Sequence, residues 1–356
     1  MSSVKYIGMD VHAATIIICV LNANGRLLKE DIIATGAEAI LNFVASQRGS
    51  LHVTFEEGEQ AAWLYDLLGD RVERVIVCDA RRNAALRQSG HKDDRSDARH
   101  LAEWLRTGNL TAVYHGERSL RTLQELKRVY TTLVEDCVRT MNRLKSLFRG
   151  RGIACSGRSV YRPSQRTEWL QRLPDDGVRQ HADLLYQELE AQQQLRRRAR
   201  HDLLAESRRR PAQRILRRIP GWGPLRVALL MAIVQTPYRF RSKRQLWTYA
   251  CLALVTAATG EYLLQQGRVV RSRRPAQVRG LNQNGHRELK ALFKGAVFTA
   301  CHRDPVWQEL WASRVARGQK PQNVHLTLSR KMAALVLHLW KKGETYDARQ
   351  LKAQAV

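Results

Sequence analysis

The chain lacks long apolar runs, closely spaced cysteines and any stretch typical of a secretory signal. No segment is both long and apolar enough to span a bilayer, so we expect no membrane partner. The opening residues, MSSVKYIGMD, contain no apolar secretory core. The six cysteines lie far apart without a C-x-x-C pair, which argues against a cysteine zinc site or a disulfide scaffold. Together these absences predict a protein of the reducing cytoplasm.

Acidic residues are much scarcer than basic residues, and they are unevenly placed. The 356 residues include 60 Lys+Arg and 33 Asp+Glu, a formal net charge of +27. Residues 1–112 hold 13 basic and 15 acidic residues, net −2, which leaves 47 and 18, net +29, for residues 113–356. A strongly basic region beside a near-neutral one favours a polyanionic partner, and nucleic acid fits best.

The order of apolar patterns in residues 1–112 predicts an α/β domain. Alternating or β-branched apolar runs predict five strands, and Asn24-Gly25 is typical of a tight hairpin turn. Helical spacing follows the third, fourth and fifth strands, so the order is βββ-α-β-α-β-α. This order is typical of a ribonuclease-H-like domain with a mixed five-stranded sheet flanked by helices. The expected strands are residues 4–9, 15–21, 27–33, 51–56 and 74–79, with the last helix from about Ala80.

Two long helical patterns follow this domain. Apolar positions recur at steps of three and four from Leu120 to Phe148, which predicts one amphipathic helix. After the loop GIACSGRSVYRPSQ, residues 181–210 form a second helical pattern that suits a coiled-coil hairpin with the first; a plain core helix pair is the alternative. At this length more than one domain is expected. We predict a RuvC-like domain in residues 1–112, a coiled-coil segment in 113–207 and a mainly α C-terminal domain in 208–356.

The C-terminal region begins with two helical segments around the turn PGWGP, residues 220–224. The arrangement resembles a helix-hairpin-helix, in which backbone amides approach a phosphate closely, although packing alone also explains glycine turns. Arginines just upstream favour the phosphate role. Among the tryptophans of the basic region, most fit core positions, and Trp222 in the turn is the candidate for base stacking. Nucleic-acid contacts are expected at Arg214, Arg217, Arg218, Gly221 and Gly223.

Carboxylates occupy the places where ribonuclease-H-like nucleases hold divalent ions. Asp10 ends the first expected strand and shares a face with Tyr6 and Gly8. Glu56 and Glu57 close the fourth strand. Magnesium prefers oxygen ligands, and a few carboxylates with water suffice to bind it. The alternatives are a turn residue for Asp10 and an ordinary helix N-terminus for the glutamates.

The stretch HKDDRSDARHLAEWL, residues 91–105, places more carboxylates at the start of a helix. Asp94 and Asp97 are three residues apart and share a helix face, whereas Asp93 points elsewhere and is better explained as a cap or a solvated charge. Aspartates in a first turn also complement the helix dipole. Asp79 is a rival ligand that suits a helix cap. The order of the acids along the chain, more than any one of them, predicts a metal site.

Several motifs together resemble a known family. The stretches YIGMDVHAAT, KDDRSDARHLAEWL, IPGWGPLRVALL and NGHRELKALFKGAV, with an acid at Glu56, are similar to those of the insertion-sequence one-ten (IS110) transposases. The resemblance covers nearly the whole chain. It implies a recombinase with a RuvC-like domain that bears a DEDD tetrad, a coiled-coil segment and a C-terminal transposase domain.

The resemblance also implies which residues act. The tetrad falls on Asp10, Glu56, Asp94 and Asp97, which would hold Mg²⁺, expected as two ions. Because this chain has EEGEQ where the family has E-[AS]-T-G, Glu57 stays open as the second acid. Family members place a serine nucleophile in an S-G pair, and the matching position here is Thr259, followed by Gly260. A threonine hydroxyl can attack phosphorus, but its methyl group crowds the approach, so Thr259 is a nucleophile, an impaired one or a turn residue.

The resemblance further implies a guide RNA that pairs with donor and target DNA, and a homo-oligomer, either a dimer or a tetramer. A region of net charge +29 suits several nucleic-acid strands, with binding that falls steeply with salt. Sequence choice would then rest on RNA pairing. The segment 267–290 is the densest basic stretch, although a solvated loop is the alternative. Its expected backbone contacts are Arg271, Arg273, Arg274 and Arg279.

Three functions therefore stay open at the level of sequence. The first is a magnesium-dependent insertion-sequence transposase or recombinase guided by RNA. The second is a RuvC-like structure-selective DNA nuclease, which needs no Thr259 and forms no covalent adduct with DNA. The third is a non-catalytic nucleic-acid-binding protein, which would tolerate the loss of Asp94.

Overall fold

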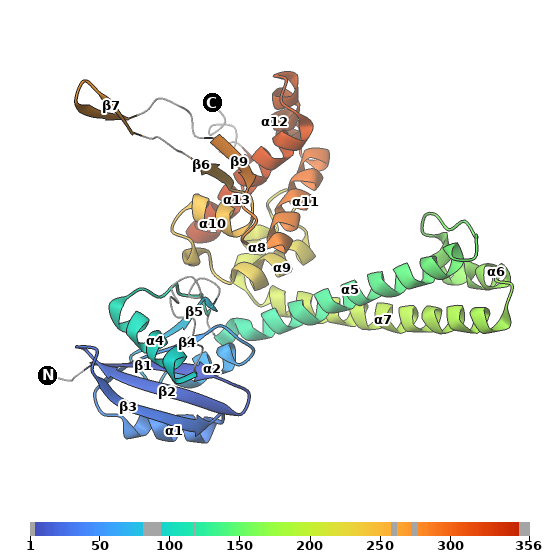
Figure 1. Ribbon diagram of the computed structural model, residues 1–356. Coiled ribbons are helices and arrows are strands. Elements are labelled where there is room, and N and C mark those ends of the chain that lie inside the picture. Colours follow the sequence, from blue (N-terminus) through green and yellow to red (C-terminus); the bar gives the residue numbers. More distant parts are fainter. Residues whose placement is uncertain (1–3, 81–93, 117, 258–261, 272–276, 349–356) are drawn as a thin grey trace. The chain divides into compact units, whose positions relative to one another are not determined.

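The computed structural model describes residues 4–80, 94–116, 118–257, 262–271 and 277–348. Contacts divide the chain into two compact units, residues 1–118 and 119–356 (Figure 1). Within the described residues, no helix combines the length and the apolar character needed to cross a bilayer.

The first unit contains a mixed five-stranded sheet in the order β3-β2-β1-β4-β5. The β1–β2 and β2–β3 pairs are antiparallel, and the β1–β4 and β4–β5 pairs are parallel. The predicted mixed sheet of five strands is therefore confirmed. The strands are β1 (Val4–Val11), β2 (Thr15–Asn22), β3 (Leu27–Ala34), β4 (Ser50–Glu56) and β5 (Arg74–Cys78).

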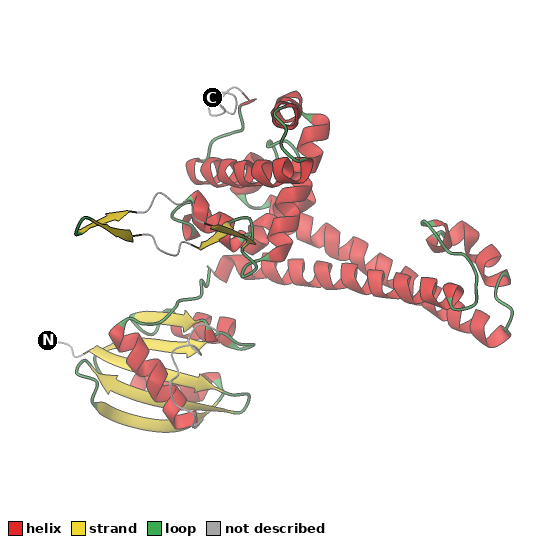
Figure 2. Ribbon diagram, turned by 45° about the horizontal axis from the view of Figure 1, so that its top comes forward, coloured by secondary structure: helices red, strands yellow, loops and turns green. Residues whose placement is uncertain are grey.

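Helices cover both faces of this sheet (Figure 2). Side chains of α1 (Ala37–Ser46) and α2 (Ala61–Leu68) share one core with the odd-numbered residues of β1 and β4. On the other face, α4 (Asp94–Thr107) buries Ala98 and Ala102 against β2. The helix expected from about Ala80 falls almost entirely outside the described residues.

The chain that leaves α4 returns along the edge of the sheet. The N–H of Asp79 donates to the carbonyl of Thr111 (3.0 Å), and the N–H of Val113 donates to that of Val77 (2.7 Å). These bonds hold residues up to Val113 on the edge strand β5. The three-domain division at residues 112 and 207 stays a prediction.

The second unit begins with two long helices that lie side by side (Figures 1 and 2). They are α5 (Arg121–Arg149) and α7 (Asp176–Arg208), close to the predicted spans. They run antiparallel: Thr140, near the C-terminal end of α5, donates through Oγ1 to Oε1 of Glu188 (3.1 Å), which lies in the N-terminal half of α7. The segment that connects them contains the short helix α6 (Arg166–Gln171) and two 3₁₀ turns, which share a small core with residues of α5 and α7. The helix pair is observed, and its coiled-coil character stays a prediction.

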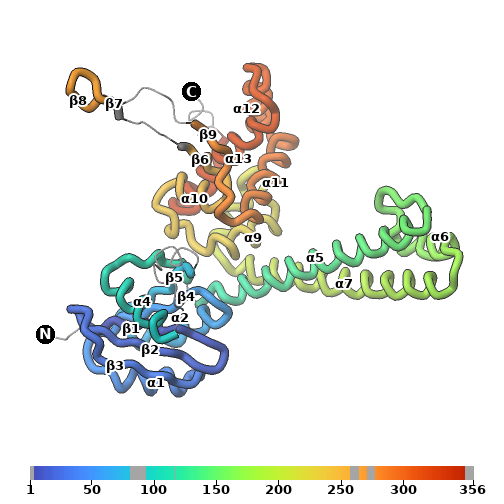
Figure 3. The backbone as a smooth tube through the Cα atoms, in the orientation of Figure 1, coloured from blue at the N-terminus to red at the C-terminus, as the bar shows by residue number. Residues whose placement is uncertain are grey.

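The rest of this unit is a helical core with two small β-ribbons (Figure 3). In the helix α9 (Pro224–Val234), every residue from Val227 to Val234 is apolar and buried in the core. The other helices are α8 (Pro211–Leu216), α10 (Lys243–Tyr249), α11 (Arg287–Arg303), α12 (Pro305–Ala316) and α13 (Pro321–Lys342). The antiparallel ribbons pair β6 (Leu254–Ala257) with β9 (Gln277–Leu281), and β7 (Tyr262–Gln265) with β8 (Arg268–Arg271).

The PGWGP turn packs into this core. Gly221 has φ +83°, and a Cβ there would lie 2.1 Å from the carbonyl oxygen of Ala296 in α11. Trp222 is 2% exposed and meets Phe293 edge to face. Arg226 Nη1 donates to the carbonyl of Gly221 (2.7 Å). The suggestion that Trp222 stacks on bases is therefore wrong, because its ring is part of the hydrophobic core.

Candidate metal centre

Asp10 and Glu56 lie next to each other at the C-terminal ends of two inner strands, β1 and β4. The parallel β1–β4 register pairs Met9 with Phe55, so the following residues of the two strands are neighbours. Met9 and Phe55 are both 0% exposed and belong to the α1–α2 core. Side chains alternate along a strand, so Asp10 and Glu56 face the opposite side, which α4 covers.

Gly8 lets α4 approach this face closely. A Cβ on Gly8 would lie 2.1 Å from the carbonyl oxygen of Ala98 and 2.5 Å from the amide nitrogen of Ala102. Only glycine permits this backbone contact. The contact holds the helix against β1, with Asp94 and Asp97 in the first turn of α4 beside the end of that strand.

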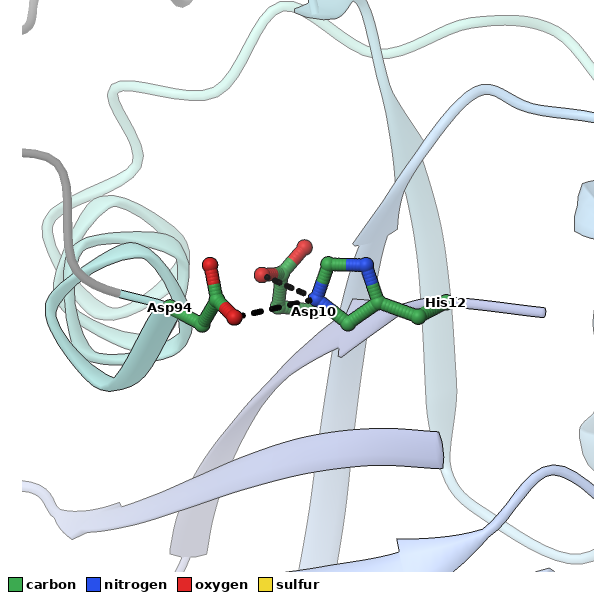
Figure 4. A group of neighbouring side chains, drawn as sticks. All are labelled: Asp10, His12 and Asp94. Carbon is green, nitrogen blue, oxygen red and sulfur yellow. Dashed lines mark ion pairs between the residues drawn. The ribbon is translucent and has the colours of Figure 1, made fainter. Parts of the chain in front are cut away.

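Three side chains meet at this point (Figure 4). Asp10, His12 and Asp94 each offer a ligand atom, and these atoms all lie within 4.8 Å of one another. His12 Nε2 is 3.2 Å from Asp10 Oδ2 and 3.7 Å from Asp94 Oδ2. The cluster joins the end of β1, the turn after it and the start of α4.

The pKa of Asp10 is raised first by burial and then by neighbouring negative charge. Burial raises the pKa of the Asp10 carboxyl above its usual value, His12 counteracts this rise, and the nearby carboxylates of Asp97 and Asp94 raise the pKa further. The Asp10 side chain is 21% exposed and that of Asp94 is 65% exposed. Converging carboxylates beside an open face fit a divalent cation, because its charge would relieve their repulsion.

The two glutamates at the end of β4 have different surroundings. Glu57 Oε2 lies 2.6 Å from His115 Nε2, and the N–H of Glu57 donates to the carbonyl of Cys78 (2.9 Å). Glu56 instead lines a cavity of about 220 Å³ together with His12. Which of the two glutamates is the second acid stays a prediction.

His12 is the member of the cluster that the sequence reasoning missed. A signal was present, because a residue two positions after Asp10 lies on the same side of an extended chain. The predicted nucleophile Thr259 and its neighbour Gly260 lie outside the described residues, just after β6.

The predicted nucleic-acid residues differ in their surroundings. Arg214, Arg217 and Arg218 are exposed on and just after α8. Gly223 is also exposed, with open space beside it, whereas Gly221 lies against α11, so packing explains its glycine. In the segment 267–290, Arg279 is exposed on β9 and Arg271 ends β8. Arg273 and Arg274 lie outside the described residues.

Comparison with known families decides the classification. A DEDD-type IS110 family model described as a transposase matches residues 7–151, which include all four predicted acids. A second model, described as transposase IS116/IS110/IS902 family, matches residues 213–312, which include Thr259. The chain belongs to the IS110 family of transposases. No curated protein matches the chain. Its function is that of an insertion-sequence transposase, an enzyme that cuts and rejoins DNA.

Proposed function

We propose that this IS110-family transposase is a metal-dependent DNA recombinase that binds two Mg²⁺ ions through Asp10, Glu56, Asp94 and Asp97. The observation that carries the proposal is the convergence of Asp10 and Asp94, from separate elements, to within 4.8 Å. Asp97 lies close enough to Asp10 to interact with it electrostatically, because its carboxylate raises the pKa of Asp10. Glu56 rather than Glu57 is the second acid, since it follows the register of Asp10.

The residues divide the chemistry of strand cleavage between them. Bound divalent ions stabilise the attacking and leaving oxygens of a phosphodiester. The four carboxylates would hold these ions, and the partial burial of Asp10 limits the movement of its side chain. Thr259 Oγ bonds to phosphorus and gives up its proton to solvent, while the departing sugar oxygen takes up a proton. The product is a covalent threonine–DNA phosphodiester.

The proposed partners follow from the charge of the chain. Residues 113–356 carry a net +29, which suits donor DNA, target DNA and a guide RNA. We assign contacts with the nucleic-acid backbone to Arg214, Arg217, Arg218, Gly221, Gly223, Arg271, Arg273, Arg274 and Arg279. The protein acts in the cytoplasm as a homo-oligomer, a dimer or a tetramer, in which one subunit supplies Thr259 to the metal centre of another.

A covalent adduct with DNA tests this function. Full-length protein incubated with its guide RNA and with DNA that carries the ends of its element should form an adduct that survives denaturing electrophoresis. Thr259→Val should abolish the adduct because it removes the hydroxyl and keeps the shape, whereas Thr259→Ser should retain it. Chelation with EDTA should abolish the adduct in every form. Cleavage without any adduct would instead favour a structure-selective nuclease.

The exposed arginines after α8 should control the salt dependence of binding. Each phosphate contact contributes about −0.9 to the slope of log K against log salt on duplex DNA. The double variant Arg217→Gln/Arg218→Gln should therefore flatten the slope by roughly 2 and weaken binding at low salt. The measurement is fluorescence anisotropy across a salt series. A matched pair from the near-neutral region, Arg48→Gln/Arg71→Gln, should leave the slope unchanged; equal effects would contradict the assignment.

A further inference from the structure

The imidazole of His12 faces the carboxylates of Asp10 and Asp94, and one ring nitrogen approaches both (Figure 4). Its Nε2 is 3.2 Å from Asp10 Oδ2 and 3.7 Å from Asp94 Oδ2. Ligand atoms at right angles around an ion, each bonded at about 2.1 Å, stand about 3 Å apart. Small side-chain adjustments would therefore place all three atoms around one cation.

The backbone of His12 is anchored on both sides. Its N–H donates to the carbonyl of Thr15 (2.9 Å), and its carbonyl accepts a hydrogen bond from Thr35 Oγ1 (2.9 Å). These bonds fix the turn between β1 and β2 and hold the side chain on the same side as Asp10. The side chain is 45% exposed, so an ion can reach it from solvent. An anchored ligand loses little freedom when an ion binds.

Nitrogen changes which cation a site prefers. Mg²⁺ takes oxygen ligands and loses its water reluctantly, whereas imidazole is a good ligand for first-row transition ions. Four carboxylates alone would form an all-oxygen site. A histidine beside two of them gives the site mixed oxygen and nitrogen donors.

We propose that His12 is a direct nitrogen ligand of the metal centre and shifts its preference from Mg²⁺ toward first-row transition ions, for which Mn²⁺ is the probe. This inference rests on the proposed metal centre at Asp10 and Asp94. The competing role for His12 is a hydrogen-bond donor that orients Asp10 without touching the ion. The two roles differ in whether nitrogen is bonded to the metal.

Pulsed electron paramagnetic resonance of Mn²⁺ bound to the full-length protein, without nucleic acid, separates these roles. The wild-type protein should show the hyperfine coupling of a bonded ¹⁴N nucleus, and His12→Ala should lose it. His12→Ala should also weaken Mn²⁺ binding by about tenfold or more, with a smaller change for Mg²⁺. His12→Asp, which restores an oxygen donor, should still bind Mg²⁺, and its bound Mn²⁺ should show no nitrogen coupling.

Another histidine–aspartate pair provides the control. His201 Nδ1 lies 3.1 Å from Asp202 Oδ1 on α7, and its side chain is 75% exposed. His201→Ala should change neither the coupling nor either affinity. Bound Mn²⁺ without nitrogen coupling in the wild-type protein would overturn the role of His12, as would equal losses of Mn²⁺ and Mg²⁺ affinity in His12→Ala. Equal Mn²⁺ binding by wild type and Asp10→Asn, or no saturable binding, would instead overturn the metal centre itself.

Discussion

Asp10→Asn should lower the rate of DNA strand cleavage by about 10³-fold or more, because the amide removes a charged ligand from a site that works as a unit. The side chain keeps its size, and Asp10 lies beside Asp94 and His12. Asp94→Asn should have a similar effect. The measurement is a single-turnover cleavage assay with DNA that carries the element's ends.

The same variant should remain folded and should still bind nucleic acid. Burial and neighbouring carboxylates raise the folded-state pKa of Asp10, so the ionised form destabilises the metal-free protein above that pKa. Because Asn carries no charge, Asp10→Asn removes this destabilisation. The melting temperature of the variant at neutral pH should therefore be equal to or higher than that of the wild-type protein. Binding should hold within about twofold, because the phosphate contacts lie in the basic region.

A distant aspartate controls for the loss of any single charge. Asp70→Asn changes an exposed residue of the same unit and should cleave at the wild-type rate. Wild-type cleavage by both Asp10→Asn and Asp94→Asn would refute the metal centre and would favour a non-catalytic nucleic-acid-binding role.

Gly8→Ala should destabilise the first unit by at least about 2 kcal/mol, since overpacking of a tight contact typically costs 1–3 kcal/mol. The added Cβ would lie 2.1 Å from the carbonyl oxygen of Ala98, so α4 must move away from β1. That movement carries Asp94 away from Asp10. Cleavage should therefore fall even at temperatures where the variant is folded. Chemical denaturation followed by circular dichroism measures the first effect.

Gly36→Ala is the matched control for this glycine. It lies at the N-terminus of α1 in the same unit, with φ −146° and nothing near its ideal Cβ. Its loss of stability should stay below about 1 kcal/mol, as expected for a cap position without a clash. If Gly8→Ala unfolds at the same denaturant concentration as Gly36→Ala and cleaves normally, the close approach of α4 does not position the site.

Local patterns were sufficient for the five strands of the first unit, for the two long helices and for the faces of the acids. Period-two alternation along β1 places Asp10 on the face of Gly8, and the register of β1 agrees. The three-residue spacing of Asp94 and Asp97 places both in the first turn of α4. The strand face of Asp10 and the spacing of Asp94 and Asp97 both depend on residues nearby in the chain, so both can be predicted from the sequence.

Contacts between residues that are far apart in the chain could not be predicted from such local patterns. The proposal of Glu56 over Glu57 draws on a contact of this kind, since His115 lies 2.6 Å from Glu57. The buried ring of Trp222 depends on Phe293 of α11. For Glu57 and for Trp222, the sequence motif left two roles open. The residue that each of them contacts lies more than 50 positions away in the chain.

The sequence by itself determined the strand and helix order of the first unit, the charge division and the positions of the acids along the chain, because periodicity and charge are local properties. Only the tertiary structure decided that Asp10, His12 and Asp94 meet, since that depends on the close contact of α4 with Gly8. This contact requires that Gly8 has no side chain and that α4, about 90 residues later in the chain, packs against it. No local sequence pattern specifies a contact between residues so far apart.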